Sequence, residues 1–376
     1  MRIAIDAQTA LGEVRSGVGE YTYRLLQGLA LLESEDQYTL YYGYARRVAS
    51  EPSIAGSDRF RSASSLIPGR LRELLIGRLH LPIEMVVGRC DVVHVPFGRV
   101  PATARARRVV TVHDINFLLQ PRSWHSDSNW QTLQGVIQGA KAADHIVADS
   151  AYTKEQIVER LGIPDQRISV VHLSLGRQAE EFFARAESRS LAASCALCPQ
   201  EPYALYVGAI EERKGLTFLL DAYKHYRMIG GEHKLVLVGF LGREVDKHMR
   251  HAEELGIAPH LSFLGHVPEE ELLKLYLRAD IFVFPSVWEG FGLPLLEALS
   301  AGRAIVARSA CSIPEVVGDA GVLVSSDVPA DFAQAVYDVT SSPSRRSELE
   351  AAASEQATRF SLRTMAEKTA EVYRRS

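Results

Sequence analysis

Short runs rich in valine and isoleucine alternate with longer stretches of helical periodicity along the whole chain. The runs lie at 2–7, 38–42, 91–95, 109–112, 145–148 and 168–172, and then at 203–207, 234–238, 261–264, 281–284, 304–307 and 321–324. Near-continuous apolar runs of this length are typical of buried parallel strands, and the helical stretches between them supply the crossover connections. The pattern therefore predicts an α/β protein with two successive doubly wound units.

The two predicted units are separated by a segment without strand character. Residues 176–201 are rich in alanine, serine and arginine and lead into Pro199 and Pro202, which is typical of an interdomain connection. We expect a first domain over 1–175, a linker over 176–201 and a second domain over 202–355. A last helix within 356–376 is expected to pack back towards the first domain.

Composition places the chain among globular proteins. It has 376 residues, 47% hydrophobic and 23% charged, which excludes a disordered or fibrous chain. A formal charge of −4 gives no reason to expect a nucleic-acid partner. The start of the chain lacks a signal-peptide pattern, and no apolar run approaches the ~18 residues that cross a bilayer. We therefore expect a cytoplasmic protein.

The cysteines predict neither a disulfide framework nor a metal site. Four cysteines are too few for a framework in a chain of this length. Cys195 and Cys198 form a CxxC pair, but Cys90 and Cys311 stand alone, so no second ligand pair completes a zinc site. We interpret the CxxC pair as incidental and expect a reducing compartment.

Residues just after each predicted strand are the first candidates for a site, because open α/β sheets bind ligands at the carboxyl ends of their strands. In the second half these residues are small: Gly208, Gly239, Gly265, Ser286 and Ser309. In the first half they are Gln8, Pro96, His113, Asp114, Ser150 and His172. Two such rims facing each other predict a substrate cleft between the domains.

The densest chemical signal follows the strand predicted at 281–284. Residues 288–297 read WEGFGLPLLE, a glycine-containing loop after which Pro294 opens a helix. The backbone N–H groups of Phe291, Gly292 and Leu293 in this loop are expected to suit an anionic phosphate. Glu289 and Glu297 could then hold a sugar and the vicinal hydroxyls of a ribose. The alternative is one loop glutamate and one exposed helical glutamate without a ligand.

A second charged cluster follows the strand predicted at 203–207. Arg213 could bind a diphosphate through two N–H groups, Lys214 adds a point charge, and Gly215 permits close approach. The alternative is an ordinary solvated charged loop.

These residues together resemble the retaining glycosyltransferases of the GT-B fold, specifically family 4. The resemblance extends over nearly the whole chain and includes SGVGEY at 16–21, DHIVADS at 144–150, RKG at 213–215, FLGHV at 263–267, the pair Glu289 and Glu297, SIPEV at 312–316 and GDA at 318–320. It implies two facing Rossmann-like domains with a cleft between them. The first would bind the acceptor and the second the nucleotide sugar.

The resemblance implies a role for each candidate in the second half. Glu289 would contact the transferred sugar and Glu297 the ribose. Arg213 and Lys214 would bind the diphosphate and stabilise its developing charge, and the backbone near Val267 would meet the base. Gly208 and Gly239 complete the expected donor-binding set. Ala209 stands where many relatives carry an arginine, so the diphosphate would depend more on Arg213 and Lys214.

Two further roles are implied in the first half. Gly17 would approach the phosphates, and His113 would reach the donor sugar and the acceptor region. The alternative for His113 is a structural histidine at a strand end.

The resemblance also implies a reaction without a metal or cofactor. No Asp-x-Asp motif occurs in the chain, so the usual ligands for a divalent cation are missing. Retention without an obvious nucleophile favours same-face attack, in which the departing phosphate oxygen deprotonates the acceptor. Asp114 is the candidate nucleophile for the alternative double displacement.

The start of the chain is similar to bacterial mannosyltransferases of polysaccharide assembly, so GDP-mannose is the expected donor, with UDP-sugars as the alternative. The expected acceptor is a saccharide or a lipid-linked saccharide. An epimerase or hydrolase acting on nucleotide sugars, or a non-catalytic sugar-nucleotide-binding protein, is the alternative function on this fold.

A basic amphipathic segment lies near the start of the chain. Between Arg59 and Leu79, five arginines (59, 61, 70, 72 and 78) surround leucines and Ile67, with few acids among them. Such a segment could lie on an anionic membrane and meet a lipid-linked acceptor, and we expect peripheral contact with the inner face of the membrane. The alternative is a helix packed on the first domain with exposed arginines.

Overall fold

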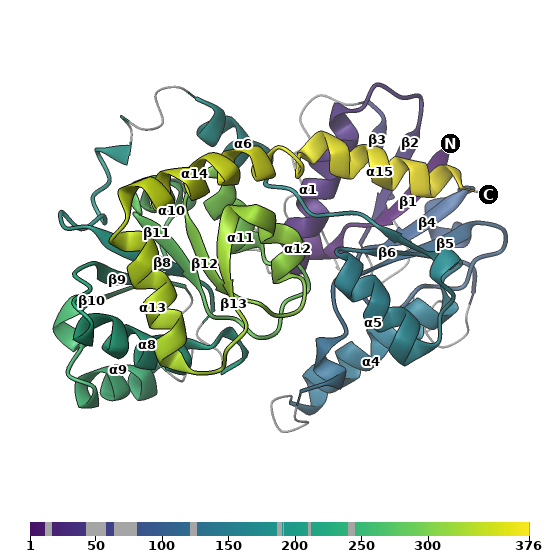
Figure 1. Cartoon of the computed structure of the whole chain (residues 1–376). Coiled ribbons are helices and arrows are strands. Elements are labelled where there is room, and N and C mark those ends of the chain that lie inside the picture. Colours follow the sequence, from purple (N-terminus) through teal and green to yellow (C-terminus); the bar gives the residue numbers. More distant parts are fainter. Residues whose placement is uncertain are drawn as a thin grey trace. The chain divides into compact units, whose positions relative to one another are not determined.

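The computed structural model describes residues 1–11, 17–42, 58–63, 81–120, 126–185, 190, 192–209, 212–239 and 245–375. The chain divides into two compact units, one formed by Met1–Gly176 with Ser361–Ser376 and the other by Arg177–Phe360 (Figure 1). We call these the first and second units and describe each by itself.

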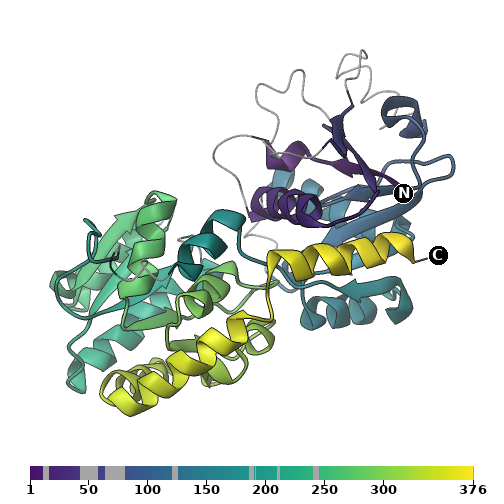
Figure 2. The same cartoon turned by 90° about the horizontal axis from the view of Figure 1, so that it is seen from above.

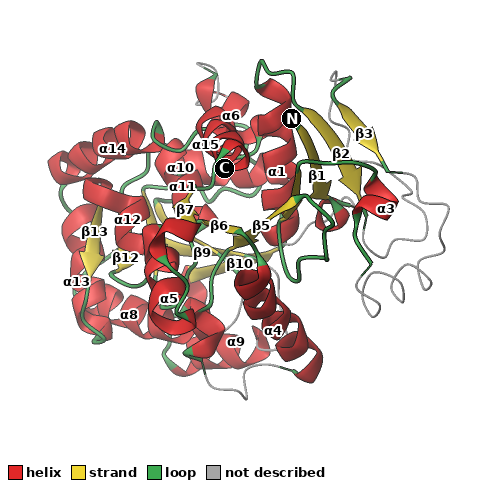
Figure 3. Ribbon diagram, turned by 90° about the vertical axis from the view of Figure 1, so that its right-hand side faces the viewer, coloured by secondary structure: helices red, strands yellow, loops and turns green. Residues whose placement is uncertain are grey.

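The first unit contains a parallel sheet of seven strands in the order β3-β2-β1-β4-β5-β6-β7. The strands are β1 (Arg2–Asp6), β2 (Gln37–Tyr41), β3 (Phe60–Ser62), β4 (Val92–Val95), β5 (Arg107–Val112), β6 (His145–Ala148) and β7 (Ile168–Val170). Figure 3 shows β1, β2 and β3 as neighbours at one edge of this sheet.

Helices cover both faces of the first sheet, as a parallel sheet requires. Helices α4 (Asp127–Ala142) and α5 (Ala151–Leu161) pack on one face, and α1 (Gly17–Leu31) and α15 (Leu362–Arg374) on the other (Figure 1). The short elements are η1 (Gln8–Ala10), α3 (Glu84–Val87), η3 (Asn116–Leu118) and η5 (Asp165–Arg167).

The second unit contains a parallel sheet of six strands in the order β10-β9-β8-β11-β12-β13. The strands are β8 (Tyr203–Val207), β9 (Lys234–Val238), β10 (Leu261–Gly265), β11 (Ile281–Phe284), β12 (Ile305–Arg308) and β13 (Gly321–Val324). Together the two sheets confirm the predicted pair of doubly wound units. Each predicted strand is present to within two residues, and β3 is an additional strand.

Helices cover both faces of the second sheet as well (Figure 1). One face carries α8 (Leu216–Met228), α9 (Val245–Glu254) and α13 (Pro329–Thr340). The other carries α10 (Glu269–Arg278), α11 (Leu293–Ser300), α12 (Ile313–Val317) and α14 (Pro343–Ala357). The remaining elements are α6 (Arg177–Ala184), η6 (Glu212–Lys214), η7 (Ala258–His260) and η8 (Gly318–Ala320). Among the described residues, no helix is long and apolar enough to cross a membrane.

Helix α15 belongs to the first unit although it ends the chain, and it lies against α1 (Figure 2). Gly28 of α1 permits this approach, because a Cβ there would come within 2.8 Å of the Leu362 carbonyl oxygen. Near the end of α15, the Tyr373 hydroxyl lies 2.6 Å from Nδ1 of buried His94. Arg107 donates to main-chain carbonyls of the same turn. These contacts explain why the last helix is part of this core.

The first two arginines of the predicted membrane segment make hydrogen bonds within the first unit. Arg59 donates to the carbonyl oxygens of Leu29, Ala30 and Leu32 at the end of α1, at 2.8–3.1 Å. Arg61, on β3, donates to the Thr39 hydroxyl at 3.1 Å. The Arg59 guanidinium is thereby held at the end of α1, whereas the Arg61 side chain remains exposed. The other three arginines, with the rest of the segment from residue 64, lie outside the described residues.

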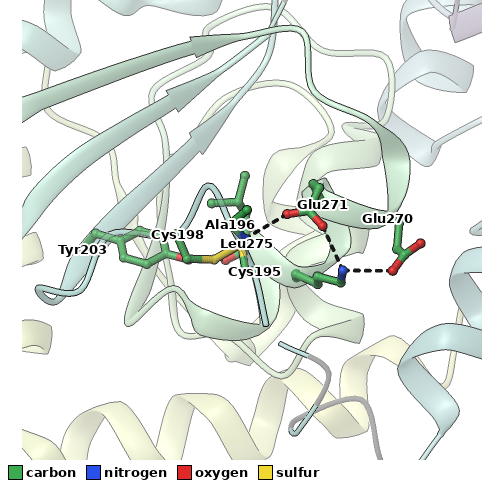
Figure 4. Close-up of a disulfide and its surroundings, with 8 residues drawn as sticks. Cys195, Ala196, Cys198, Tyr203, Glu270, Glu271 and Leu275 are labelled. Carbon is green, nitrogen blue, oxygen red and sulfur yellow. Dashed lines mark hydrogen bonds and ion pairs between the residues drawn. A yellow bond between two sulfur atoms is a disulfide. The ribbon is translucent and has the colours of Figure 1, made fainter. Parts of the chain in front are cut away.

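The expectation that the CxxC pair is incidental is wrong. Cys195 and Cys198 are both buried and form a disulfide in which the two Cα atoms are 5.5 Å apart (Figure 4). Tyr203 packs beside Cys198 and donates to the Leu275 carbonyl of α10 at 2.7 Å. Residues 177–184, expected within a linker, form α6 instead, which contacts α10 in the second unit.

Candidate active site

Two neighbouring strands of the second unit place the predicted charged residues together. Strands β8 and β11 pair in parallel, so the segments that follow them leave from the same edge of the sheet. Arg213 and Lys214 end the short helical turn η6 after β8. The main-chain carbonyl of Arg213 accepts from the Val287 N–H at 3.2 Å and from the Ser286 hydroxyl at 3.3 Å. The two segments are thereby joined at their backbones.

Gly215 is required by this junction. Its φ is +71°, in the left-handed region, and a Cβ would come within 2.4 Å of the Pro285 carbonyl oxygen. A side chain at this position would both strain the backbone and push the two segments apart. This one contact therefore sets how closely the segments after β8 and β11 approach each other.

The central contact of the site is an ion pair between Lys214 and Glu289. Lys214 Nζ lies 2.5 Å from Glu289 Oε1, and only 11% and 8% of these side chains are exposed. Lys214 Nζ also lies 5.9 Å from the centre of the Phe284 ring. Beside the pair, Arg213 Nη1 lies 3.5 Å from the Trp288 carbonyl oxygen. Removing either partner of such a buried pair leaves an uncompensated charge, so the two side chains depend on each other.

The loop that carries Glu289 is held by the start of α12. The Ser312 hydroxyl is buried and lies 3.2 Å from the carbonyl oxygens of both Glu289 and Phe291. Ser312 was present in the SIPEV motif, but the sequence did not predict this contact. Two main-chain positions of the loop are therefore fixed by one side chain.

Glu297 lies one turn inside α11 and has a buried partner. The helix begins after Gly292, whose φ of +99° requires the left-handed region, and Pro294 lies in its first turn. The Tyr276 hydroxyl of α10 donates to Glu297 Oε2 at 2.8 Å. Burial, together with the Glu297 charge, raises the pKa of the Tyr276 phenol well above its ordinary value, so the phenol remains a donor. Tyr276 is a site residue that the sequence did not reveal.

Glycines at the ends of β8 and β9 allow these strands to approach closely. The Gly208 N–H donates to the Val238 carbonyl at 3.0 Å, and the Gly239 N–H donates to the Gly265 carbonyl at 2.9 Å. A Cβ on Gly239 would lie 1.9 Å from the Gly208 carbonyl oxygen. Val267, two residues beyond β10, is buried. At the edge predicted to bind the donor, two adjacent strands are therefore followed by glycines, which present only main-chain atoms there.

The remaining predicted residues lie in the first unit. Gly17 is the exposed first residue of α1, and a Cβ there would meet no atom within 4 Å. His113 follows β5, and its Nδ1 lies 2.6 Å from Asp149 Oδ2. The His113 ring is 4.7 Å from the Tyr21 ring, edge to face, and 6.3 Å from the Phe97 ring.

The environment of His113 favours its charged form. Burial alone would lower the pKa of His113, but the charges of Asp149 and Asp114 and the hydrogen bond to Asp149 outweigh it, so the pKa is raised. Asp149 directly follows a predicted strand, and only this position at a neighbouring strand end could have revealed it. Asp149 lies in the DHIVADS motif at 144–150, but nothing in the sequence assigned it a role.

No group of three or more histidine, cysteine or acidic side chains arranged to hold a metal ion occurs in the part of the chain that the structure describes. The charged groups at the edge of the second sheet are instead two cations and two carboxylates. This set can bind a diphosphate through the cations and hydroxyl groups through the carboxylates.

Two family models match the chain in succession. Residues 15–174 match the model described as Glycosyltransferase Family 4, and residues 193–358 match the model described as Glycosyl transferases group 1. The O-antigen chain mannosyltransferase B of Escherichia coli is 31% identical over 331 residues, which cover 84% of each chain.

Solved structures share the fold. The sucrose-phosphate synthase of Thermosynechococcus elongatus is similar with a TM-score of 0.74 at 18% identity, covering 99% of this chain and 98% of that one. HepE of Anabaena in complex with UDP and glucose gives a TM-score of 0.68 at 17% identity, covering 99% and 98%.

Proposed function

Because the chain belongs to glycosyltransferase family 4, we propose that it transfers a mannosyl group from GDP-mannose to a saccharide or lipid-linked saccharide, with retention of anomeric configuration. The similarity to a mannosyltransferase named for the O-antigen chain supports mannose as the sugar and cell-surface polysaccharide assembly as the process. The proposed reaction takes place on the cytoplasmic side of the membrane.

The observation that carries the proposal is the buried pair of Lys214 and Glu289 beside Arg213. A bound diphosphate would take over Lys214 as a partner and accept from Arg213. Glu289 would then be released to accept hydrogen bonds from hydroxyl groups of the sugar. One exchange of partners thus couples donor binding to the placement of the reacting sugar.

The proposed chemistry is a same-face substitution at the anomeric carbon. The bond between this carbon and the diphosphate oxygen breaks, and the acceptor hydroxyl oxygen forms the new bond on the same face. The departing phosphate oxygen takes the hydroxyl proton. Arg213 and Lys214 stabilise the negative charge that develops on the diphosphate as this bond breaks. Fixed positive charges lower the activation barrier most where such charge develops. No metal is needed for this role in our proposal.

The other residues bind the ends of the donor in the proposal. Glu297, oriented by Tyr276, accepts from the ribose hydroxyls, and the backbone near Val267 meets the base. The N–H groups from Phe291 to Leu293 face the phosphates. In the first unit, His113 acts on the donor sugar and the acceptor region, and Gly17 approaches the phosphates.

The central test is Glu289→Gln, which keeps the size of the side chain and removes its charge. We expect transfer to fall on the order of 100-fold or more, as for loss of a group that acts in the transition state. The matched control is Glu270→Gln, because Glu270 is an exposed residue of α10 that pairs with Lys274 at 2.9 Å. Turnover near that of the parent in Glu289→Gln would refute the assignment.

The donor and the stereochemistry have their own tests. A thermal-shift screen with GDP-, UDP- and ADP-sugars should show the largest stabilisation with GDP-mannose, and a larger shift with a UDP-sugar would overturn that choice. NMR of the product should show the α-anomer that an α-linked donor implies, and EDTA should leave the rate unchanged. Rapid donor hydrolysis or epimerisation without acceptor would favour the alternative enzymes.

Peripheral membrane contact through Arg59–Leu79 is a separate proposal, and residues 64–79 of this segment lie outside the described residues. Flotation with anionic liposomes should be lost in the Arg70→Glu, Arg72→Glu, Arg78→Glu triple variant, because the attraction depends on positive charge. Equal flotation of the triple variant and the parent would exclude membrane contact through this segment.

A further inference from the structure

Two strand ends of the first unit bring His113 and Asp149 together. Strands β5 and β6 pair in parallel with Val112 opposite Ala148. The next residue on each strand is His113 and Asp149, so both leave the same edge side by side. The resulting distance between His113 Nδ1 and Asp149 Oδ2 is 2.6 Å.

Asp149 is a buried carboxylate, and its burial is expected to lower the stability of the folded unit. Its side chain is only 2% exposed, and its second oxygen has no hydrogen-bond partner among the described residues. A buried carboxylate with an unused oxygen costs stability, so its presence points to a role other than stabilising the fold.

Capping of the next helix does not explain Asp149. The cap of α5 is supplied by Ser150, whose hydroxyl accepts from the Thr153 N–H at 3.1 Å. The only hydrogen bond of the Asp149 side chain within the described part of the chain goes to His113. The carboxylate therefore serves the imidazole.

The imidazole is packed on several sides, and one of its nitrogens makes no close hydrogen bond. Tyr21 meets the His113 ring edge to face, and Phe97 lies roughly parallel to it. Nε2 of His113 is buried and makes no hydrogen bond of 3.5 Å or less in the ranges that the structure describes, and a weaker interaction with the Pro96 carbonyl contributes to the raised pKa of this ring. With Nδ1 donating to Asp149, Nε2 is the one ring nitrogen left for a ligand.

We propose that Asp149 is a positioning residue for the transfer reaction, which accepts the Nδ1 hydrogen of His113 and thereby fixes the ring and reserves Nε2 for the sugar or the acceptor. This inference rests on the proposed function, because His113 acts on the substrates there. Asp149 itself touches neither substrate.

The first experiment measures His113 without any turnover. Histidine labelled with ¹³C allows the His113 ring to be titrated by NMR. The His113→Gln variant identifies the His113 signal, because that signal is missing from its spectrum. Asp114, Tyr21 and His94 also face this ring and are unchanged in the variants. In Asp149→Asn the amide oxygen can still accept from Nδ1, but the negative charge is gone. The pKa of His113 should therefore fall relative to the parent.

The matched control is Asp144→Asn, at the other end of β6. Asp144 pairs with Arg108 at 2.7 Å, and 40% of its side chain is exposed. This variant should leave the His113 titration and the transfer rate unchanged. A His113 titration that is the same in Asp149→Asn and in the parent would overturn the proposal.

The second experiment is a double-mutant cycle on transfer. Asp149→Asn should lower kcat by about 10- to 100-fold, the loss typical when the hydrogen-bond partner of a metal-binding histidine is removed, with little change in the affinity for GDP. In a His113→Ala background the same change should cost less than about twofold, because Asp149 acts through His113. An equal loss in both backgrounds would show an independent role and refute the proposal.

The two experiments separate the failure of this inference from that of the proposed function. If His113→Ala retains the transfer rate of the parent, His113 has no part in the reaction and that part of the proposed function fails. The NMR titration would still show whether Asp149 controls the imidazole.

Discussion

Acidification should destabilise the first unit through His94. This side chain is completely buried on β4, with the Tyr373 hydroxyl 2.6 Å from Nδ1 and the Thr111 hydroxyl 2.8 Å from Nε2. Burial, and to a smaller extent the charge of His113, lowers the pKa of His94 to about 3. The folded unit therefore keeps this ring neutral over most of the acidic range.

The sign and size follow from linkage. In the unfolded chain the His94 pKa is about 6.5. Between pH of about 6.5 and 3 the unfolded chain binds a proton that the folded unit does not, so stability falls as the pH falls. Lowering the pH from about 7.5 to about 5 should cost about 2 kcal/mol through His94 alone.

Urea unfolding followed by tryptophan fluorescence would measure this loss. The chain has three tryptophans, and replacing Trp288 by Phe leaves those at 124 and 130, within the first unit. In this background we compare the parent with His94→Gln at both pH values. His94→Gln should be less stable at the higher pH, but its loss on acidification should be smaller by about 2 kcal/mol.

Other histidines do not confuse the comparison. Burial lowers the pKa of His145 to about 4, so it acts in the same direction, whereas the raised pKa of His113 acts in the opposite direction. Both are present in the two proteins and affect each similarly. If the parent and His94→Gln lose the same free energy of unfolding on acidification, the reasoning about His94 is refuted.

Two further predictions concern the second unit. Gly215→Ala should weaken GDP binding and destabilise the unit by more than Gly230→Ala, because both glycines have positive φ but only Gly215 has a backbone atom where the Cβ would lie. Gly230→Ala should lower the free energy of unfolding by about 1 kcal/mol. Equal losses for the two variants in urea unfolding would contradict the role of the close contact. Tyr276→Phe should weaken GDP binding about tenfold by removing the donor to Glu297. The control is Tyr203→Phe, which removes a hydrogen bond to the main chain of the same helix α10 and should leave GDP affinity unchanged. Equal GDP affinity of Tyr276→Phe and Tyr203→Phe would show that Glu297 does not depend on Tyr276.

The candidate site was predictable where its residues follow strands. Arg213, Lys214 and Glu289 each come shortly after an apolar run, so their gathering at one sheet edge follows from parallel pairing. Tyr276 and Asp149 were not assigned roles, because nothing in a helix or in a strand-end aspartate indicates which distant side chain it will meet.

The amino-acid sequence determined the order of strands and helices and the chemical class of the protein. Three local patterns in the sequence have direct counterparts in the structure. Apolar runs form strands, strand-end glycines allow close approach of backbones, and charged residues at set spacing form charged loops. Tertiary structure decided which groups are partners. Lys214 meets Glu289 across 75 positions, His113 meets Asp149 across 36, and His94 meets Tyr373 across 279. It also placed Arg59 at the end of α1 instead of on an exposed face. Such pairings depend on how the strands and helices pack, which no local pattern along the chain encodes.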